Sequence, residues 1–147
     1  MSDKALIAMV DTNVWVDVIL SRPGFVEESK GALMVCLEEG DEVLVAATSL
    51  KDIFFFAERS AGADAAYRAV ELVLDIATPA QVDALVCRNA LVLERPDYED
   101  GIVAACMSAE GADAIVTRDA ESFSKLEVPK YSPSEFIAAR GFESISL

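Results

Sequence analysis

The chain has 147 residues, of which 53% are hydrophobic and 26% charged, so one domain with a sizeable core is expected over residues 1–147. It contains no apolar run of about 18 residues or more and no recognisable signal peptide, which predicts a cytoplasmic protein without a membrane span. The formal net charge of −14 argues against passive binding to polyanions and favours a cation or a basic partner.

The absence of histidine restricts the chemistry. It excludes Ser-His-Asp and Cys-His catalysis and any histidine-ligated metal. The three cysteines, Cys36, Cys87 and Cys106, are widely spaced and form no Cys-x-x-Cys pair, so we expect buried thiols in a reducing compartment and no zinc site. Any catalysis must therefore use carboxylates, hydroxyls, lysine or arginine.

The first third of the chain alternates between buried strands and helices. Ala5 to Val10 is a continuous apolar run, typical of a parallel strand covered on both faces. Thr12 or Asn13 can cap a helix that follows to about Leu20. Helical spacing, glycine stops and a second apolar run then predict these elements: helix 26–39, strand 43–47, helix 50–61 and helix 63–76.

The same alternation continues towards the C-terminus. Thr78 and Pro79 have the pattern of a cap and a first helical residue, which predicts a helix to about Leu91, with a short strand at 76–77 before it. Three more elements follow: a helix from Asp97 to Gly111, a strand over 113–117 and a short helix capped by Ser132. Residues from about 141 are expected to form a loose tail. This βα pattern predicts a single α/β domain with helices on both faces of a parallel sheet.

Acidic residues stand where strands end and helices begin. Asp11 ends the first strand and Asp119 follows the strand over 113–117, so both belong to the same edge of a parallel sheet. Asp52 lies in the first turn after the second strand, and Asp100 in the first turn of the helix opened by Asp97. These side chains are therefore expected to converge.

Clustered carboxylates repel one another unless a cation lies between them. Oxygen ligands alone suit Mg²⁺ or Mn²⁺ and do not suit zinc or copper. Such an ion polarises a phosphate and lowers the pKa of a bound water, which is a device for cleaving phosphodiesters without histidine.

Each acid also has a simpler explanation. Asp11 could serve simply as the cap of the first helix, and Asp52 could be an acid that interacts favourably with a helix dipole. Asp97 and Asp100 fit a capping box in which Asp replaces Glu, and Asp119 could be a turn residue. The metal hypothesis rests on their occurring together at matching positions.

Four segments resemble a PIN domain, of the PilT N-terminus superfamily that includes VapC-type toxins. They are Val10-Asp11-Thr12-Asn13-Val14, Thr48-Ser49-Leu50-Lys51-Asp52-Ile53, Asp97-Tyr98-Glu99-Asp100-Gly101-Ile102-Val103-Ala104-Ala105, and Ile115-Val116-Thr117-Arg118-Asp119 with Phe123. The resemblance implies a Rossmann-like three-layer α/β/α sandwich with a central, mainly parallel sheet. It also implies a Mg²⁺- or Mn²⁺-dependent ribonuclease, often the toxin of a toxin–antitoxin pair.

By position, the resemblance implies metal ligands at Asp11, Asp100 and Asp119, with Asp52 as the fourth catalytic acid. Supporting hydrogen bonds would come from Thr12, Asn13, Asp97 and Thr117.

Two positions depart from the family pattern. The family usually has Glu where this chain has Asp52, whose side chain is one methylene shorter. In the related branch the last motif often reads Thr-Arg-Asn with Asp just before Phe, whereas here the acid is Asp119 and Ser122 precedes Phe123.

RNA binding by so acidic a protein needs cations. Arg22, Lys51 and Arg118 lie near the predicted edge by sequence and could bind phosphates, or they could be ordinary solvated cations. The acidity also suits a basic antitoxin segment, or it serves only solubility. Three consecutive aromatics, Phe54 to Phe56, cannot all face one core, which places part of them at a homodimer or antitoxin interface.

Three functions remain open at this point. The first is a metal-dependent endoribonuclease, and the second is a non-catalytic PIN-like module that binds a partner protein or RNA. The third is a receiver or phosphohydrolase, which requires an acceptor Asp with a specific Lys or an Asp-x-Asp pair. Asp11-Thr12-Asn13 lacks that second acid.

Overall fold

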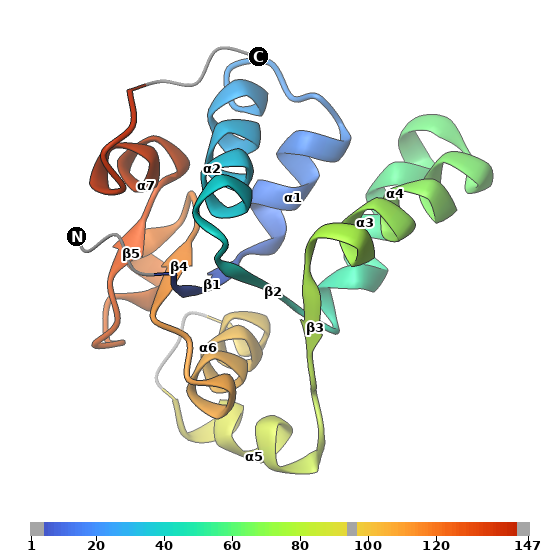
Figure 1. Ribbon diagram of the computed structural model, residues 1–147. Helices are drawn as coiled ribbons and strands as arrows, with labels where there is room; N and C mark the ends of the chain where they lie inside the picture. The colour runs from blue at the N-terminus through green and yellow to red at the C-terminus, as the bar shows by residue number, and fades with distance from the viewer. Residues whose placement is uncertain (1–4, 94–96, 144–147) are drawn as a thin grey trace.

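The computed structural model describes residues 5–93 and 97–143. Within this part of the chain, five parallel strands form one sheet in the order β3-β2-β1-β4-β5 (Figure 1). The strands are β1 (Ile7–Val10), β2 (Glu42–Ala46), β3 (Thr78–Ala80), β4 (Ala114–Val116) and β5 (Lys130–Tyr131). The helices are α1 (Thr12–Ile19), α2 (Val26–Glu39), α3 (Ser49–Ala61), α4 (Ala63–Ile76), α5 (Ala84–Val92), α6 (Tyr98–Glu110) and α7 (Pro133–Ala139), with a 3₁₀ turn η1 (Ala120–Phe123).

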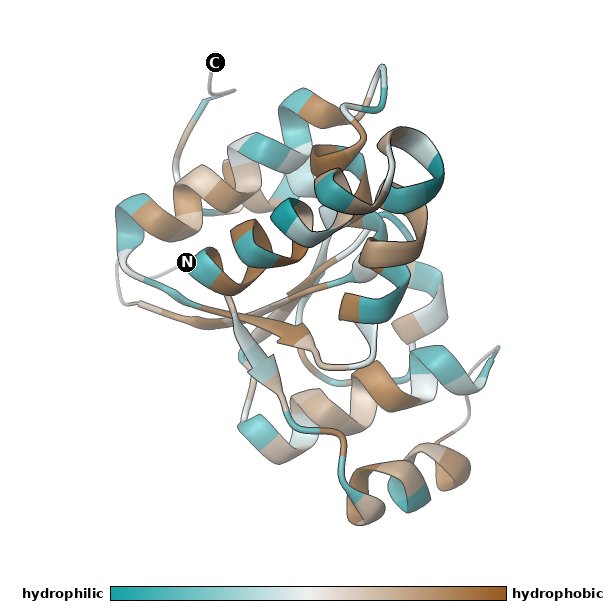
Figure 2. Cartoon of the chain, turned by 90° about the vertical axis from the view of Figure 1, so that its right-hand side faces the viewer, coloured by the Kyte–Doolittle hydropathy of each residue, from teal (hydrophilic) through white to brown (hydrophobic). Residues whose placement is uncertain are grey.

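Helices cover both faces of this sheet, which confirms the predicted α/β sandwich. Alternate strand residues enter two cores: Val43 and Val45 pack beneath α1, α2, α3, α4 and α7, and Leu44 and Ala46 pack against α5 and α6. In Figure 2 part of the sheet is brown, whereas the helices carry both brown and teal segments. No helix among the described residues is long and apolar enough to cross a membrane.

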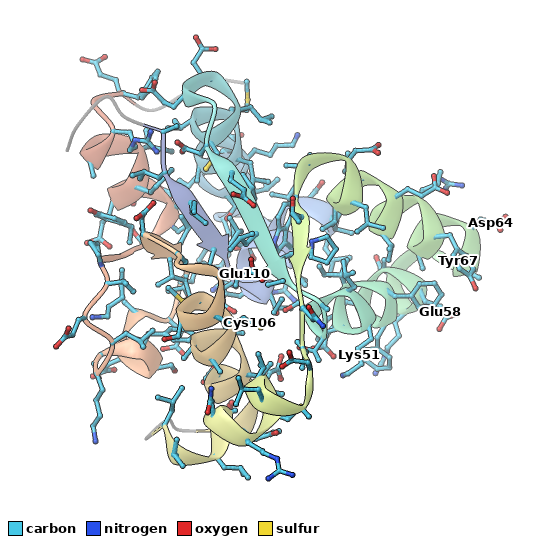
Figure 3. All side chains as sticks on the ribbon, turned by 60° about the horizontal axis from the view of Figure 1, so that its bottom comes forward. Lys51, Glu58, Asp64, Tyr67, Cys106 and Glu110 are labelled. Carbon is cyan, nitrogen blue, oxygen red and sulfur yellow. The ribbon has the colours of Figure 1, made fainter. Side chains whose placement is uncertain are left out.

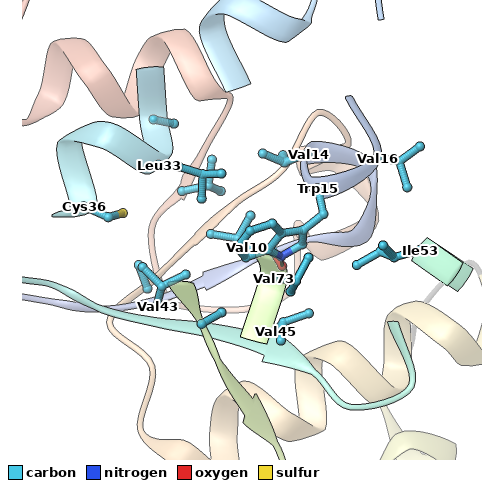
Figure 4. Packing of buried hydrophobic residues seen from close by; sticks show 14 of the residues in the cluster. Val10, Val14, Trp15, Val16, Leu33, Cys36, Val43, Val45, Ile53 and Val73 are labelled. Carbon is cyan, nitrogen blue, oxygen red and sulfur yellow. Dashed lines mark hydrogen bonds between the residues drawn. The ribbon is translucent and has the colours of Figure 1, made fainter. Parts of the chain in front are cut away.

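Trp15 lies at the centre of the larger core, which is the one that contains Val43 and Val45 (Figure 4). In the sequence it closely follows Asp11 at the end of β1. The side chain is 1% exposed and its indole N–H donates to the carbonyl of Val10 at 3.1 Å. This bond satisfies the one polar group of the ring while the ring fills the core. Packing of α1 against β1 therefore fixes the backbone on either side of Asp11.

The predicted helix start at Thr78-Pro79 is wrong, because these residues form the edge strand β3. Thr78 and Pro79 pair with Leu44 and Val45 of β2, and the helix begins only at Ala84. Its cap is Asp83, whose side chain accepts from the N–H of Val86 at 2.9 Å. A proline is tolerated at this position because an edge strand leaves one row of N–H groups unused.

Other boundaries differ by a few residues. Asp11 caps α1 in place of Thr12 or Asn13, and Thr48 precedes α3 without a side-chain cap bond. The two-residue strand β5 has too few residues to show a period in the sequence.

The predicted loose tail is packed against the domain at its start. The N–H of Phe142 donates to the carbonyl of Ile137 at 3.1 Å, and its ring packs against the larger core. Residues 144–147 of that predicted tail lie outside the described chain.

The Gly101→Ala protein is expected to be less stable by about 1–3 kcal/mol, the usual cost of overpacking. A Cβ at Gly101 would lie 2.8 Å from the carbonyl oxygen of Ala90, so α5 and α6 would have to move apart. Urea unfolding followed by circular dichroism measures the change. Ser108→Ala, an exposed position on the same helix, is the control and should shift stability far less. Equal stability of the two variants would contradict the close approach.

Candidate active site

The site lies where the order of the strands reverses. From β1 the chain proceeds to β2 and β3 on one side, then returns to β4 and β5 on the other. In open parallel sheets the carboxyl ends of the strands at this switch point border a binding crevice. Asp11 follows β1 directly, and its N–H donates to the carbonyl of Val116 in β4 at 3.0 Å. The ends of β1 and β4 are therefore tied together at the crevice.

Asp11 is almost completely buried, at 7% exposure, and is held by hydrogen bonds to both oxygens. The hydroxyl of Thr117 donates to Oδ2 at 2.8 Å, and the N–H of Thr12 donates to Oδ1 at 2.9 Å. The same Thr117 oxygen accepts from the N–H of Asp119 at 3.0 Å, and Asn13 Nδ2 lies 3.4 Å from it. One hydroxyl thus fixes the two strand-end acids relative to each other.

Asp100 reaches the crevice from the first turn of α6. Asp97 caps this helix by accepting from the N–H of Asp100 at 2.9 Å. Burial, and next the charges of Asp97, Asp11 and Asp119, raise the pKa of Asp100 to about 6. Burial is also the main cause that raises the pKa of Asp11, against the hydrogen bonds that lower it, with smaller contributions from Asp119 and Asp97. Asp97 and Asp119 therefore lie close enough to Asp11 and Asp100 to disfavour the charged forms of these two acids.

A pocket of about 260 Å³ opens beside these acids. It is lined by Asp11, Thr12, Asn13, Val16, Arg22, Phe56, Glu99 and Asp100. A larger hollow of about 710 Å³ between α2 and α7 contains none of the predicted site residues. The smaller pocket is the candidate active site because it alone of these two is walled by the converging acids.

Asp52 stands apart from the other predicted acids. It receives a hydrogen bond from Lys51 at 2.9 Å and is not among the residues that line the pocket. Figure 3 shows Lys51 near the base of the hairpin formed by α3 and α4. The neighbour of Asp52 across the site is Glu99, whose pKa is raised to about 7 by burial, by a hydrogen bond to Asp52 and by the charges of Asp52 and Asp97.

Glu99 is a site residue that the sequence reasoning missed. It lies in the Asp-x-Glu-Asp segment beside Asp100, so the available signal was a third acid in one first helical turn. Glu99 lines the pocket, whereas Asp52 does not.

The predicted phosphate-binding residues have different surroundings. Arg118 donates to both oxygens of Asp17, at 2.7 and 3.0 Å, and its guanidinium lies 4.1 Å from the ring centroid of Phe25. Arg22 lies 3.6 Å from the same carboxylate and also lines the pocket. Asp17 has no exposed surface and is the second residue that the sequence did not single out. It could have been noticed as an acid within the apolar pattern of α1.

Comparison with known proteins identifies the family. A profile of the PIN domain matches residues 8–121, more than half of the chain and all four acids of the predicted site. The chain belongs to the PIN-domain family. Comparison with curated proteins gives no significant match.

Several solved structures share the PIN-domain fold of this chain. VapBC2 of Rickettsia felis, bound to a DNA fragment from its promoter, has a TM-score of 0.65 at 16% identity, covering 86% of this chain and 98% of that one. VapBC-1 of nontypeable Haemophilus influenzae has a TM-score of 0.65 at 14% identity, covering 88% and 99%. VapC20 of Mycobacterium tuberculosis, a toxin that cleaves the sarcin–ricin loop, has a TM-score of 0.63 at 19% identity, covering 95% and 99%. At these identities the likeness establishes the fold.

The donor set of this PIN domain fits a hard divalent cation. Among the described residues no three acidic or cysteine side chains already stand as a ligand group for one ion. Mg²⁺ does not need such a group, since it keeps several waters and binds through one or two carboxylates together with substrate phosphates. Asp11 and Asp100 line one pocket, their ligand atoms are all oxygen, and their charges disfavour each other until a cation is present.

The raised pKa values make the stability of the metal-free PIN domain depend on pH. Because folding raises the pKa of Asp100 from 3.8 to about 6, its contribution to stability is full below pH about 4 and is lost as pH rises through about 6. Asp100→Asn should therefore raise the Tm in chelator, by more at pH 7.5 than at pH 4.5. Thermal unfolding at both pH values tests this, with Glu110→Gln on the exposed end of α6 as control. A gain in Tm that is the same at both pH values would contradict it.

Proposed function

We propose that this PIN domain is a metal-dependent endoribonuclease. The observation that carries the proposal is that Asp11 and Asp100 line one pocket at the switch point of the sheet, where burial and the charges of Asp97, Asp11 and Asp119 raise the pKa of Asp100. Such an arrangement reduces stability in the absence of a cation, so it is better explained by binding than by folding.

In the proposed mechanism some residues bind the metal ion, and others orient the metal ligands or water. Asp11 and Asp100 would hold a Mg²⁺ or Mn²⁺ ion, with Asp119 beside them. The bound ion would polarise a phosphate oxygen and lower the pKa of a water that attacks in line. Thr117 keeps the carboxylate of Asp11 turned to the crevice through the 2.8 Å bond to Oδ2. Glu99 lines the pocket and Asp52 lies outside it beside Glu99, and together they would orient water.

RNA cleavage in the presence and absence of metal tests the proposal. The purified protein is incubated with a mixture of single-stranded RNAs, first with Mn²⁺ and then with excess chelator. We expect cleavage that needs Mn²⁺ and returns when the ion is restored. Cleavage that persists in chelator would overturn the metal mechanism.

A non-catalytic PIN-like module that binds a partner protein or RNA is the second candidate. It is favoured by Asp52, which is paired with Lys51 and lies outside the pocket. Metal affinity separates the two functions, since a protein without a Mn²⁺ site at these acids would fit only the second.

Toxin activity and an antitoxin partner are part of the proposal. They are supported by the fold shared with VapBC2, VapBC-1 and VapC20. Exposed apolar side chains that a partner or a second copy could cover lie on α4 and α5: Tyr67, Leu72, Leu74, Leu85, Leu91 and Val92. Tyr67 lies at the outer end of the hairpin of α3 and α4 (Figure 3). Light scattering of the purified chain distinguishes a monomer from the proposed homodimer.

A further inference from the structure

A cation and an aromatic ring stand together on the wall of the acidic pocket. Arg22 and Phe56 both line it, as do Asp11 and Asp100. The guanidinium carbon of Arg22 lies 6.0 Å from the ring centroid of Phe56. They come from different parts of the chain, the loop after α1 and the middle of α3, so only the fold brings them together.

The charge of Arg22 is only partly neutralised. Its nearest carboxylate, Asp17, is 3.6 Å away and already receives two shorter bonds from Arg118 and one from Ser29 at 3.1 Å. One negative charge is thus shared between two guanidinium groups. The excess positive charge lies on Arg22, which is the more exposed of the two arginines and lines the pocket.

Phe56 has an exposed ring that the core does not require. Of the three consecutive phenylalanines, Phe54 packs against Tyr67 with ring centroids 4.9 Å apart and belongs to the edge of the larger core. Phe56 is 39% exposed. An exposed aromatic face beside a phosphate-binding cation is the arrangement with which proteins hold an unpaired nucleotide.

We propose that Arg22 and Phe56 form a nucleotide subsite beside the acids, in which Arg22 binds the phosphate next to the scissile one and Phe56 stacks on the base. This inference rests on the proposed function and specifies its substrate as single-stranded RNA, because a base must leave its helix to stack on a protein ring. The pocket of about 260 Å³ is slightly smaller than typical small-molecule sites, which suits one nucleotide unit.

The chain contains a matched control for Arg22. Arg59 lies over Phe55 at 5.4 Å, also on α3, and Phe55 is 47% exposed. Neither residue lines the pocket. Arg59 is therefore a control for Arg22, because it is an arginine beside an aromatic ring outside the pocket. The ring of Phe55 packs edge-to-face against that of Phe56, with centroids 5.5 Å apart, so Phe55 is not a separate control for Phe56.

Binding of a short single-stranded oligoribonucleotide, measured by fluorescence anisotropy in chelator, tests the proposal without catalysis. All variants are made in an Asp100→Asn background, which removes one repelling charge and prevents cleavage. Arg22→Ala and Phe56→Ala should each raise the Kd roughly 10-fold, whereas Phe56→Tyr should bind nearly as the parent does. Arg22→Ala should also reduce the salt dependence by about one phosphate contact. Arg59→Ala should leave the Kd unchanged.

Two outcomes would overturn the subsite. One is a Kd that Arg22→Ala and Phe56→Ala leave unchanged, and the other is an equal loss of affinity in Arg59→Ala and Arg22→Ala, which would indicate a diffuse charge effect. An oligonucleotide carrying 2-aminopurine adds a second readout, since stacking on Phe56 quenches its fluorescence and Phe56→Ala should abolish the quenching. If the protein with Asp100 intact cleaves RNA with Mn²⁺ but these variants bind normally, only the subsite fails. If it does not cleave although binding depends on Arg22 and Phe56, only the nuclease function fails.

Discussion

The Asp100→Asn protein is expected to cleave RNA about 100-fold more slowly than the unsubstituted chain at saturating Mn²⁺. Substituting residues that merely support a metal ligand typically costs 10- to 100-fold, so loss of a ligand should cost at least the upper value. Asn keeps the size of the side chain but removes the charge that balances the cation. Initial cleavage rates over a range of Mn²⁺ concentrations measure the effect.

This prediction separates loss of function from loss of fold. Asp100 has a pKa raised by burial and by Asp97, Asp11 and Asp119, so its neutralisation should stabilise the metal-free protein. The variant should therefore cleave RNA about 100-fold more slowly and also be more resistant to heat in chelator. Glu110→Gln, at the other end of α6, should cleave at the parental rate. An active Asp100→Asn protein would exclude Asp100 as a ligand.

The Asp17→Asn protein is expected to lose about 3 kcal/mol of folding free energy. Removing one member of a buried ion pair usually costs 3–5 kcal/mol, because the remaining charge is left without a partner. We expect the lower end here, since the side chains of Arg118 and Arg22 are 27% and 35% exposed and water can solvate them in part. Urea unfolding by circular dichroism provides the measurement.

A surface acid serves as the control for this substitution. Asp75→Asn changes the same charge at an exposed position on α4 and should alter stability by less than about 0.5 kcal/mol. If Asp17→Asn is no less stable than Asp75→Asn, the proposed role of Asp17 as the shared counter-charge of two arginines is wrong.

Positions that depend on the geometry of a parallel sheet were predictable from the sequence. The apolar runs that end at Asp11 and before Asp119 place both acids at one sheet edge, and the structure has both there. Asp100 follows from the helix start at Asp97, because a first-turn residue on the same helix face as the apolar Val103 and Ala104 points towards the sheet.

Positions that depend on contacts between distant segments were not predictable. From the sequence Arg118 could be a phosphate-binding or solvated cation. In the structure it is paired with Asp17, which is 101 residues away along the chain. The sequence gives Glu99 no role of its own, because its hydrogen bond to Asp52 joins two segments that lie far apart along the chain. Pro79 has the local pattern of a helix start, and pairing with β2 overrides that pattern at the sheet edge.

Calorimetric titration of Mn²⁺ into the chelator-treated protein at pH 7.5 shows whether Asp11 and Asp100 form a metal site. The Asp11→Asn and Asp100→Asn proteins are titrated in the same way. We expect the unsubstituted chain to bind Mn²⁺ and each substitution to weaken binding by about 10-fold or more. Binding of equal strength in all three proteins, or no binding in any, would contradict the proposal that these acids form a metal site.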